Sequence, residues 1–151
     1  MRIRAGVVLI EADKVALIER HRAGRHYYVF PGGGMDEDET PEQAAVREME
    51  EETGLRVTVQ RMVAEIHFGL SIQYYYLAER VGGEFGTGGG EEYTDADPED
   101  PTEGVYVPVW MSLEELSTHE NVYPADVATL VVDAVKVGWP EEPILVVEYP
   151  R

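Results

Sequence analysis

The 151-residue chain contains no cysteine, so it has neither a disulfide bond nor a thiol nucleophile. Cations are scarce as well, because 12 Lys and Arg residues face 30 Asp and Glu residues and leave a net charge of −18. Such a charge argues against nonspecific binding to nucleic acid or to an anionic membrane. It favours a protein that recruits cations.

Long apolar runs are also missing. No run approaches the length of a transmembrane helix, and the first apolar stretch, residues 5–10, is short and ends at Glu11. We therefore expect no signal peptide and a cytoplasmic location. The length and the ordinary hydrophobic fraction of 44% indicate one globular domain over residues 1–151.

The stretch 33–55 carries the most information, and its second half predicts a helix with both ends marked. Thr40 is a suitable N-cap, Pro41 suits the first helical position, and Gln43 stands where a capping box needs it. Gly54 is placed to end the helix in a left-handed turn. The side expected to face the core carries Ala45, Val46, Met49 and Thr53.

Three glutamates, Glu48, Glu51 and Glu52, fall together on a neighbouring side of this helix. Like charges at these spacings repel, and the C-terminal half of a helix disfavours negative charge. A helix selected for stability alone would not carry this cluster. A hard divalent cation such as Mg²⁺, which prefers oxygen ligands and often lies between carboxylates and phosphates, would turn the repulsion into binding.

The spacing G-x5-E-x7-R-E-U-x-E-E-x-G-U, where U is an aliphatic residue, resembles the Nudix box. The matching positions are Gly33, Glu39, Arg47, Glu48, Met49, Glu51, Glu52, Gly54 and Leu55. The resemblance implies a hydrolase that cleaves the pyrophosphate bond of a nucleoside diphosphate linked to another group, with Mg²⁺ or Mn²⁺ as cofactor. It also implies an α+β fold, a three-layer α/β/α sandwich around a mixed β-sheet.

The resemblance further assigns roles. Its implied metal ligands are the carbonyl of Gly33 and the side chains of Glu48, Glu51 and Glu52. Arg47 would orient the glutamates by ion pairing, and Glu39 would brace the junction of loop and helix. The general base is either a glutamate of the cluster or an acid from the glycine- and acid-rich segment 82–104, in which Glu92 is a candidate metal ligand.

An anionic substrate in so acidic a chain needs basic groups near the site. Residues 20–26 are the only basic cluster, and we predict a loop there whose Arg22 and Arg25 contact substrate phosphates. Tyr28 and Tyr75 are further candidates for substrate contact, since a tyrosine ring can stack on a base. The competing interpretation is a solvated loop and ordinary sheet tyrosines.

The rest of the chain alternates between strand and helix patterns. We predict strands at 2–11, 14–20, 27–30, 56–68, 71–80, 105–110 and 144–149, with helices starting at Ser112 and spanning 126–137. A tight turn at Ala12–Asp13 is expected to join the first two strands. The apolar face of the last helix would carry Val127, Leu130, Val131, Ala134 and Val135. His67 is expected to be a half-buried strand residue.

The substrate is left as a nucleoside di- or triphosphate, an oxidised nucleotide or a dinucleoside polyphosphate. The expected partner is a nucleotide-type small molecule, with neither nucleic acid nor membrane, and a homodimer stays open. Two rival functions are a non-catalytic nucleotide sensor with a Nudix fold and a simple cation buffer. Arg47 and the basic residues 20–26 argue against the buffer, and the complete box argues against the sensor.

Overall fold

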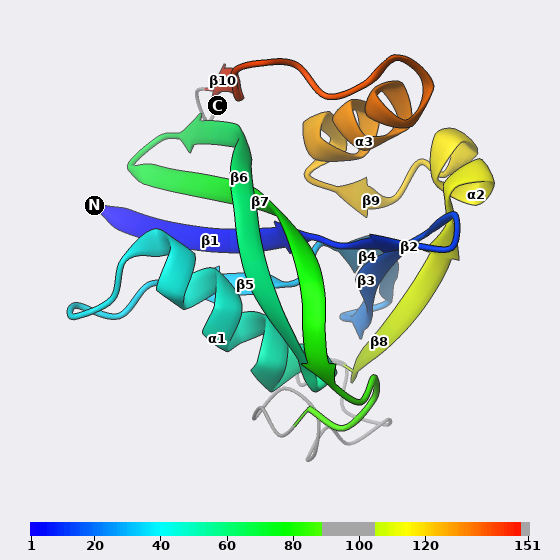
Figure 1. Ribbon diagram of the computed structural model, residues 1–151, viewed down its shortest axis with the longest axis horizontal. Coiled ribbons are helices and arrows are strands. Elements are labelled where there is room, and N and C mark those ends of the chain that lie inside the picture. Colours follow the sequence, from blue (N-terminus) through cyan, green and yellow to red (C-terminus); the bar gives the residue numbers. More distant parts are fainter. Residues whose placement is uncertain (89–104, 149–151) are drawn as a thin grey trace.

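The computed structural model describes residues 1–88 and 105–148, which form two β-sheets and three helices (Figure 1). In these ranges no helix is long and apolar enough to cross a membrane. The mixture of sheets and helices confirms the predicted α+β class.

The first sheet is mixed. Its strands β6 and β7 form a long antiparallel pair, while β1 runs parallel to β7 and β10 runs parallel to β6. The short β5 closes the other edge, antiparallel to β1. In spatial order the strands are β10 (Ile144–Glu148), β6 (Leu55–Phe68), β7 (Ser71–Gly83), β1 (Arg2–Val8) and β5 (Gly32–Gly34).

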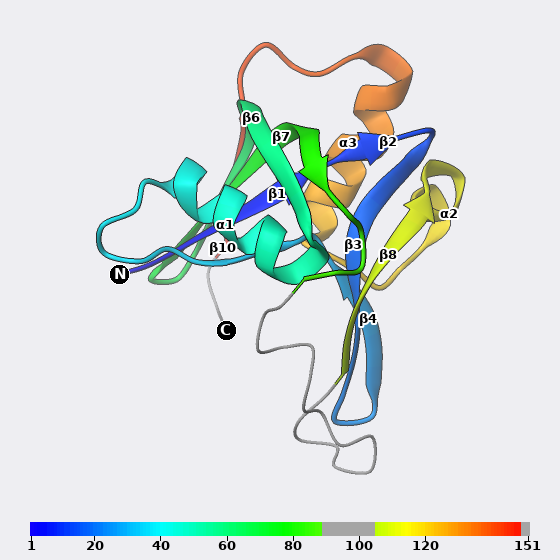
Figure 2. The same ribbon diagram turned by 60° about the horizontal axis from the view of Figure 1, so that its bottom comes forward.

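The second sheet is built around β3, which pairs antiparallel with β2, β4 and β8. Figure 2 shows β3, β4 and β8 running together as an arm that extends away from the first sheet. The strands are β2 (Ile10–Glu11), β3 (Lys14–Arg22), β4 (Arg25–Val29), β8 (Val105–Ser112) and β9 (Val122–Tyr123).

Helices cover both faces of the first sheet. On one face, Ala45 and Met49 of α1 (Pro41–Thr53) pack against residues such as Val7 and Tyr76. On the other face, α3 (Ala125–Val137) and α2 (Leu113–Thr118) pack in a second cluster that contains Ile66 and Tyr75. The three-layer arrangement expected from the Nudix resemblance is therefore present (Figure 1).

The long strand pair and the later strands lie close to their predicted positions. The predicted strand at 2–11 is interrupted at Leu9, because the chain leaves the first sheet there and continues as β2 in the second sheet. The tight turn at Ala12–Asp13 is confirmed, and both residues have positive φ angles, 49° and 63°. His67 lies half-buried on β6, as predicted.

The prediction of a loop over residues 20–26 was wrong. β3 and β4 continue to the Arg22–Arg25 pair and are joined by a two-residue turn. Ala23 and Gly24 have φ angles of 52° and 77°, which suit the tight hairpin turns that match strand twist. The arginines of this segment therefore lie on one face of a hairpin, and its two histidines lie on the other face.

Two other expectations need correction or fall outside the described ranges. Val135 is 47% exposed, and Val137 is 86% exposed, because the last turn of α3 extends beyond the core; Ala128 is buried instead. In the glycine- and acid-rich segment 82–104, strand β7 includes residues up to Gly83, and the description of the chain continues to residue 88. Glu92 and the rest of that segment, like Tyr149 at the end of the predicted last strand, lie outside the described residues.

Candidate active site

Helix α1 begins and ends as its sequence predicts. The Thr40 hydroxyl accepts a hydrogen bond from the Gln43 backbone N–H, and the Gln43 side chain accepts one from the Thr40 N–H. Pro41 occupies the first turn, where its missing N–H costs nothing. Gly54 ends the helix with a φ of 85°, and its N–H donates to the carbonyl of Glu50.

Two of the three glutamates in the predicted cluster point inward. Glu48 and Glu52 lie one turn apart and are 9% and 6% exposed. The Glu52 Oε1 atom accepts a hydrogen bond from the Gly32 N–H at 3.2 Å. The Glu51 side chain is 45% exposed and turns toward Arg47 instead. Shielded carboxylates of this kind are costly unless other groups compensate their charge.

The glycines of β5 allow the strand to approach these carboxylates closely. A β-carbon at position 33 would lie 2.5 Å from Cδ of Glu48, and one at position 32 would lie 2.4 Å from the carbonyl oxygen of Ala5. Neither glycine has a positive φ. Space, and not backbone conformation, therefore requires glycine at these two positions.

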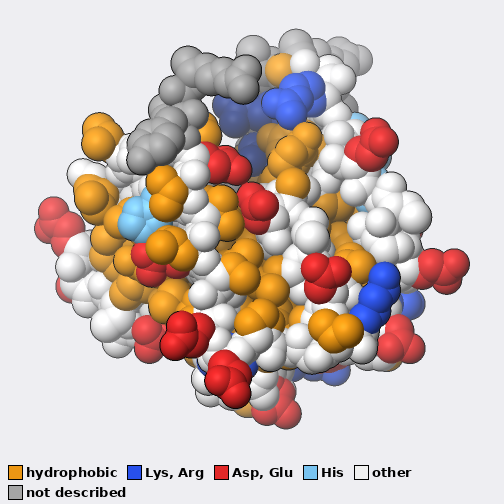
Figure 3. Space-filling view, turned by 90° about the horizontal axis from the view of Figure 1, so that it is seen from above, with side chains coloured by type: hydrophobic (Ala, Val, Ile, Leu, Met, Phe, Trp, Pro, Cys, Tyr) orange, Lys and Arg blue, Asp and Glu red, His pale blue; other side chains and the backbone are white. Residues whose placement is uncertain are grey.

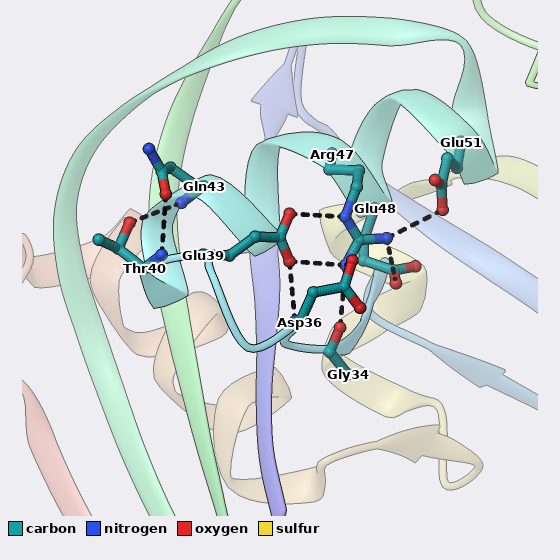
Figure 4. A network of polar contacts seen from close by, with 8 residues as sticks. All are labelled: Gly34, Asp36, Glu39, Thr40, Gln43, Arg47, Glu48 and Glu51. Carbon is teal, nitrogen blue, oxygen red and sulfur yellow. Dashed lines mark hydrogen bonds and ion pairs between the residues drawn. The ribbon is translucent and has the colours of Figure 1, made fainter.

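Arg47 connects three segments, which are strand β5, the loop between β5 and α1, and helix α1 itself (Figure 4). Its guanidinium forms a two-pronged pair with Glu39, with Nε and Nη2 at 2.7 and 2.9 Å from the two carboxylate oxygens. Nη2 also donates to the Gly34 carbonyl at 3.0 Å. Nη1 donates to Glu48 at 3.0 Å and to Glu51 at 3.2 Å. The planar fork of arginine fits this set of acceptors, as a point-like ammonium would not.

The charges of this network reinforce one another. The hydrogen bonds from Arg47 and from the Asp36 backbone N–H hold the pKa of Glu39 below its ordinary value. In return, the hydrogen bond to Glu39 and the charge of Glu48 raise the pKa of Arg47. Glu39 thus braces the loop against the helix, and Arg47 fixes the Glu48 carboxylate.

Beside the two shielded glutamates lies a cavity of about 670 Å³. Its charged side chains are four arginines and three glutamates: Arg2, Arg4, Arg20, Arg22, Glu48, Glu52 and Glu148. In the space-filling view, several Lys and Arg side chains gather in a hollow near the top and others lie at the lower right, while Asp and Glu side chains are scattered over that face (Figure 3). In a chain with a net charge of −18, this concentration of arginine provides a local site for an anion.

Arg20 carries a buried hydrogen-bond donor that no acceptor satisfies. Its guanidinium lies 4.0 Å from the centre of the Tyr106 ring and Nη2 donates to the Tyr106 hydroxyl. Its Nε atom is buried and has no hydrogen-bond partner. A buried donor left in this state costs free energy, so an acceptor from a bound anion would stabilise the site.

The structure brings some of the predicted site residues together and separates others. Arg22 and Tyr75 lie on the cavity wall with Glu48, Glu52 and Gly33. Tyr75 is only 8% exposed, because its ring packs against Gly6 and Phe30.

The other predicted contact residues are not part of the wall. Arg25 lies at the turn of the β3–β4 hairpin, 5.0 Å from the centre of the Tyr27 ring. Tyr28 faces the other side of that hairpin, where its hydroxyl donates to Glu19 at 3.3 Å.

Three arginines of the cavity were missed from the sequence. Arg2 and Arg4 alternate on β1, and Arg20 stands two residues before Arg22 on β3, so each pair shares one face of its strand. That period of two was the available signal. No sequence pattern indicated that the two strands would approach each other at one cavity.

Sequence comparison matches residues 1–130 to the NUDIX domain family. The chain belongs to the Nudix family. The 8-oxo-dGTP diphosphatase of Proteus vulgaris is 40% identical over 62 residues, which cover 38% of this chain and 54% of that protein. An RNA pyrophosphohydrolase of Photobacterium profundum is 43% identical over 80 residues, which cover 53% of this chain and 44% of that protein. The matched regions thus span about half the length of these relatives.

Structural comparison agrees at the level of the fold. The crystal structure of a NUDIX hydrolase from Nitrosomonas europaea superposes with a TM-score of 0.76 at 19% identity, covering 99% of this chain and 79% of that one. Such a likeness shows the shared fold and leaves the substrate to be argued from the cavity.

Nudix hydrolases use a divalent metal ion, and the donors of this Nudix domain fit one. Gly33 approaches the Glu48 carboxylate closely, so the backbone of β5 lies beside a shielded anionic group. Glu52 stands on the same wall, and all these donors are hard oxygens of the kind that Mg²⁺ and Mn²⁺ prefer.

Proposed function

We propose that this chain is a divalent-cation-dependent pyrophosphohydrolase that acts on nucleotides. One observation carries the proposal: two shielded carboxylates, Glu48 and Glu52, share a cavity with four arginines. The carboxylates suit a cation and the arginines suit phosphates. A cavity of about 670 Å³ also has the size of an ordinary small-molecule site.

Glu48 and Glu52, with the Gly33 carbonyl, would hold the cation, and Mg²⁺ is the ion we propose because the donor set is all oxygen. Bound there, the cation would neutralise phosphate charge and lower the pKa of a water molecule. Arg47 keeps the Glu48 carboxylate in place through its bond at 3.0 Å. Glu51 is bound to Arg47 in the present arrangement, so it would have to turn to join the ligands.

The arginines favour a substrate with a long phosphate chain. Four arginines stand against three glutamates on the wall, and a bound divalent cation increases the positive excess. A nucleoside triphosphate balances such a site better than a diphosphate linked to a neutral sugar. The relatives named for 8-oxo-dGTP and for RNA support the nucleotide class. We therefore propose a nucleoside triphosphate as substrate, cleaved at a pyrophosphate bond.

The nucleobase would lie at the aromatic rim of the cavity. Phe68 and Tyr123 line it and remain 44% and 38% exposed, which leaves ring surface for stacking. Tyr75 offers little of its ring by comparison, with 8% exposed.

A panel of nucleotides with product identification tests this proposal. Nucleoside triphosphates, their oxidised forms, dinucleoside polyphosphates and ADP-ribose are incubated with the chain and Mg²⁺, and products are separated by ion-exchange chromatography. We expect a triphosphate to be cleaved most efficiently. Tight binding of a nucleotide without cleavage of any member of the panel would instead support the sensor.

A further inference from the structure

The β3–β4 hairpin has two chemically different faces. Strand alternation places Arg20 and Arg22 on the face that lines the cavity. Glu19 and His21, one residue out of phase, lie on the opposite face. In the cross-strand register His21 stands directly opposite His26, and Glu19 stands opposite Tyr28. The hairpin therefore carries a second set of polar side chains that the proposed hydrolysis does not use.

Three of these side chains converge. The Glu19 Oε2 atom lies 2.6 Å from His26 Nε2 and 3.4 Å from His21 Nε2. One ligand atom from each residue lies within 4.8 Å of the other two, and in the described ranges this is the one such group of three. The imidazole rings are stacked, with centres 4.1 Å apart and planes 13° apart. The same ring nitrogen of both histidines thus faces the same carboxylate.

We propose that Glu19, His21 and His26 form a binding site for a transition-metal dication of the Zn²⁺ type, separate from the Mg²⁺ site at Glu48 and Glu52. Two imidazoles and one carboxylate are a ligand set that such ions favour over Mg²⁺. Ligands held at zinc–ligand distances in a tetrahedron lie about 3.4 Å apart. The separation of Glu19 from His21, 3.4 Å, matches this value, and that from His26, 2.6 Å, is shorter, so small rotations of these side chains suffice to bind an ion.

The surroundings support a site over a simple ion pair. The Tyr28 hydroxyl donates to the same Glu19 oxygen at 3.3 Å, and such a bond orients a ligating carboxylate. His119 packs edge-on against the Tyr28 ring at 4.9 Å between centres. A His–Glu ion pair needs only one imidazole, as His67 and Glu65 on β6 show at 2.5 Å.

The site is open to solvent, so an ion can enter without a change of fold. His21 and His26 side chains are about half exposed, at 52% and 49%, and Glu19 is 25% exposed. An ion bound here would tie β3 to β4 two residues from the turn, on the back of the strand segment that presents Arg22 to the cavity. Occupancy would therefore stiffen the hairpin (Figure 2).

The test uses the full chain labelled with ¹⁵N and the imidazole nitrogen resonances of its four histidines. Zn²⁺ is added in the presence of excess Mg²⁺, which keeps the carboxylate site at Glu48 and Glu52 occupied. We expect the Nε2 resonances of His21 and His26 to shift together, saturating at one Zn²⁺ per chain. The resonances of His67 should stay in place. Zn²⁺ that leaves His21 and His26 unshifted would overturn the proposal.

Variants then identify the ligands. His21→Gln, His26→Gln and Glu19→Gln should each weaken Zn²⁺ binding at least tenfold in calorimetric titration, whereas His67→Gln, which breaks the comparison pair, should leave it unchanged. Equal affinity in the His26→Gln variant and the unsubstituted chain would contradict the assignment. None of these readouts needs turnover, so they stand apart from the success or failure of the proposed hydrolase activity.

Discussion

Gly33 and Glu48 are in such close contact that a β-carbon on Gly33 would lie 2.5 Å from Cδ of Glu48 and within 2.7 Å of both carboxylate oxygens. The obstacle at this position is the end of a flexible side chain, whereas at Gly32 it is the backbone of Ala5 and Gly6. At Gly34 a β-carbon would meet nothing within 4 Å. Three neighbouring glycines thus have three different constraints.

Alanine substitutions at these three positions should separate activity from stability. Gly33→Ala should displace the Glu48 carboxylate and reduce kcat by about 10–100-fold, the range for disturbing the support of a metal ligand. Its free energy of unfolding should change little. Gly32→Ala should lower that free energy by about 1–3 kcal/mol, as overpacking does. Gly34→Ala is the control and should alter neither quantity in kinetic assays and urea titrations.

A reversed pattern would contradict this geometry. If Gly34→Ala abolished activity while Gly33→Ala retained it, the Glu48 carboxylate would not be the group that the glycine strand accommodates.

Arg47→Lys keeps the positive charge but removes the planar fork. Lysine cannot bond both oxygens of Glu39 while also reaching the Gly34 carbonyl and Glu48. We expect kcat to fall about 10–100-fold, with a smaller change in KM, because the ligand is misplaced and substrate binding is not. Steady-state kinetics with saturating Mg²⁺ measure both. A large rise in KM at unchanged kcat would instead place Arg47 in substrate binding.

The cavity arginines can be tested against a matched residue on the same hairpin. Arg22→Gln and Arg20→Gln should each lower kcat/KM by roughly 10–100-fold, the worth of a hydrogen bond to a charged group, mainly through KM. Arg25→Gln removes the same charge from a residue that does not line the cavity, and it should leave kcat/KM nearly unchanged. Equal losses in Arg22→Gln and Arg25→Gln would indicate a general electrostatic effect.

Glu39 should make stability depend on pH. Its pKa in the folded chain lies below the ordinary value of 4.5, so the unfolded chain binds a proton first as the pH falls. Its ionised form therefore stabilises the fold above that value, and this contribution disappears as the pH falls through the lower, folded value. The difference in unfolding free energy between the unsubstituted chain and Glu39→Gln should be constant near neutral pH and shrink below about pH 4.5.

Urea titrations at a series of pH values measure this difference. A difference that stayed constant through the acid range would show that the bonds to Arg47 and Asp36 do not hold the pKa of Glu39 down.

Local sequence was enough to predict helix α1 and its glutamates. The caps at Thr40 and Gly54 and the spacing of Glu48 and Glu52 depend only on neighbours within a few residues. The same holds for the turn at Ala12–Asp13. For this reason the helix that carries the shielded glutamates could be predicted without knowledge of any tertiary contact.

Other features depend on contacts between distant segments. The contact of Gly33 with Glu48, the meeting of Arg4 with Arg20 at one cavity, and the cross-strand pairing of His21 with His26 follow from sheet order and register. Composition misled at residues 20–26, where a basic cluster suggested a loop but the two-residue turn produced a hairpin. Arg25 was predicted with Arg22 to contact phosphates, and it stands opposite Arg22 in the hairpin, but it does not line the cavity.

The most direct test of the account is cleavage of the best triphosphate substrate with and without divalent cation, followed by ³¹P NMR, in the unsubstituted chain and in Glu48→Gln and Glu52→Gln. These variants remove a negative charge from each shielded carboxylate while keeping its shape. The account predicts pyrophosphate-bond cleavage that stops with chelator, returns with Mg²⁺, and falls at least ~10²-fold in each variant, on the scale of losing a main electrostatic group. Full cleavage in excess chelator, or variants as active as the unsubstituted chain, would contradict it.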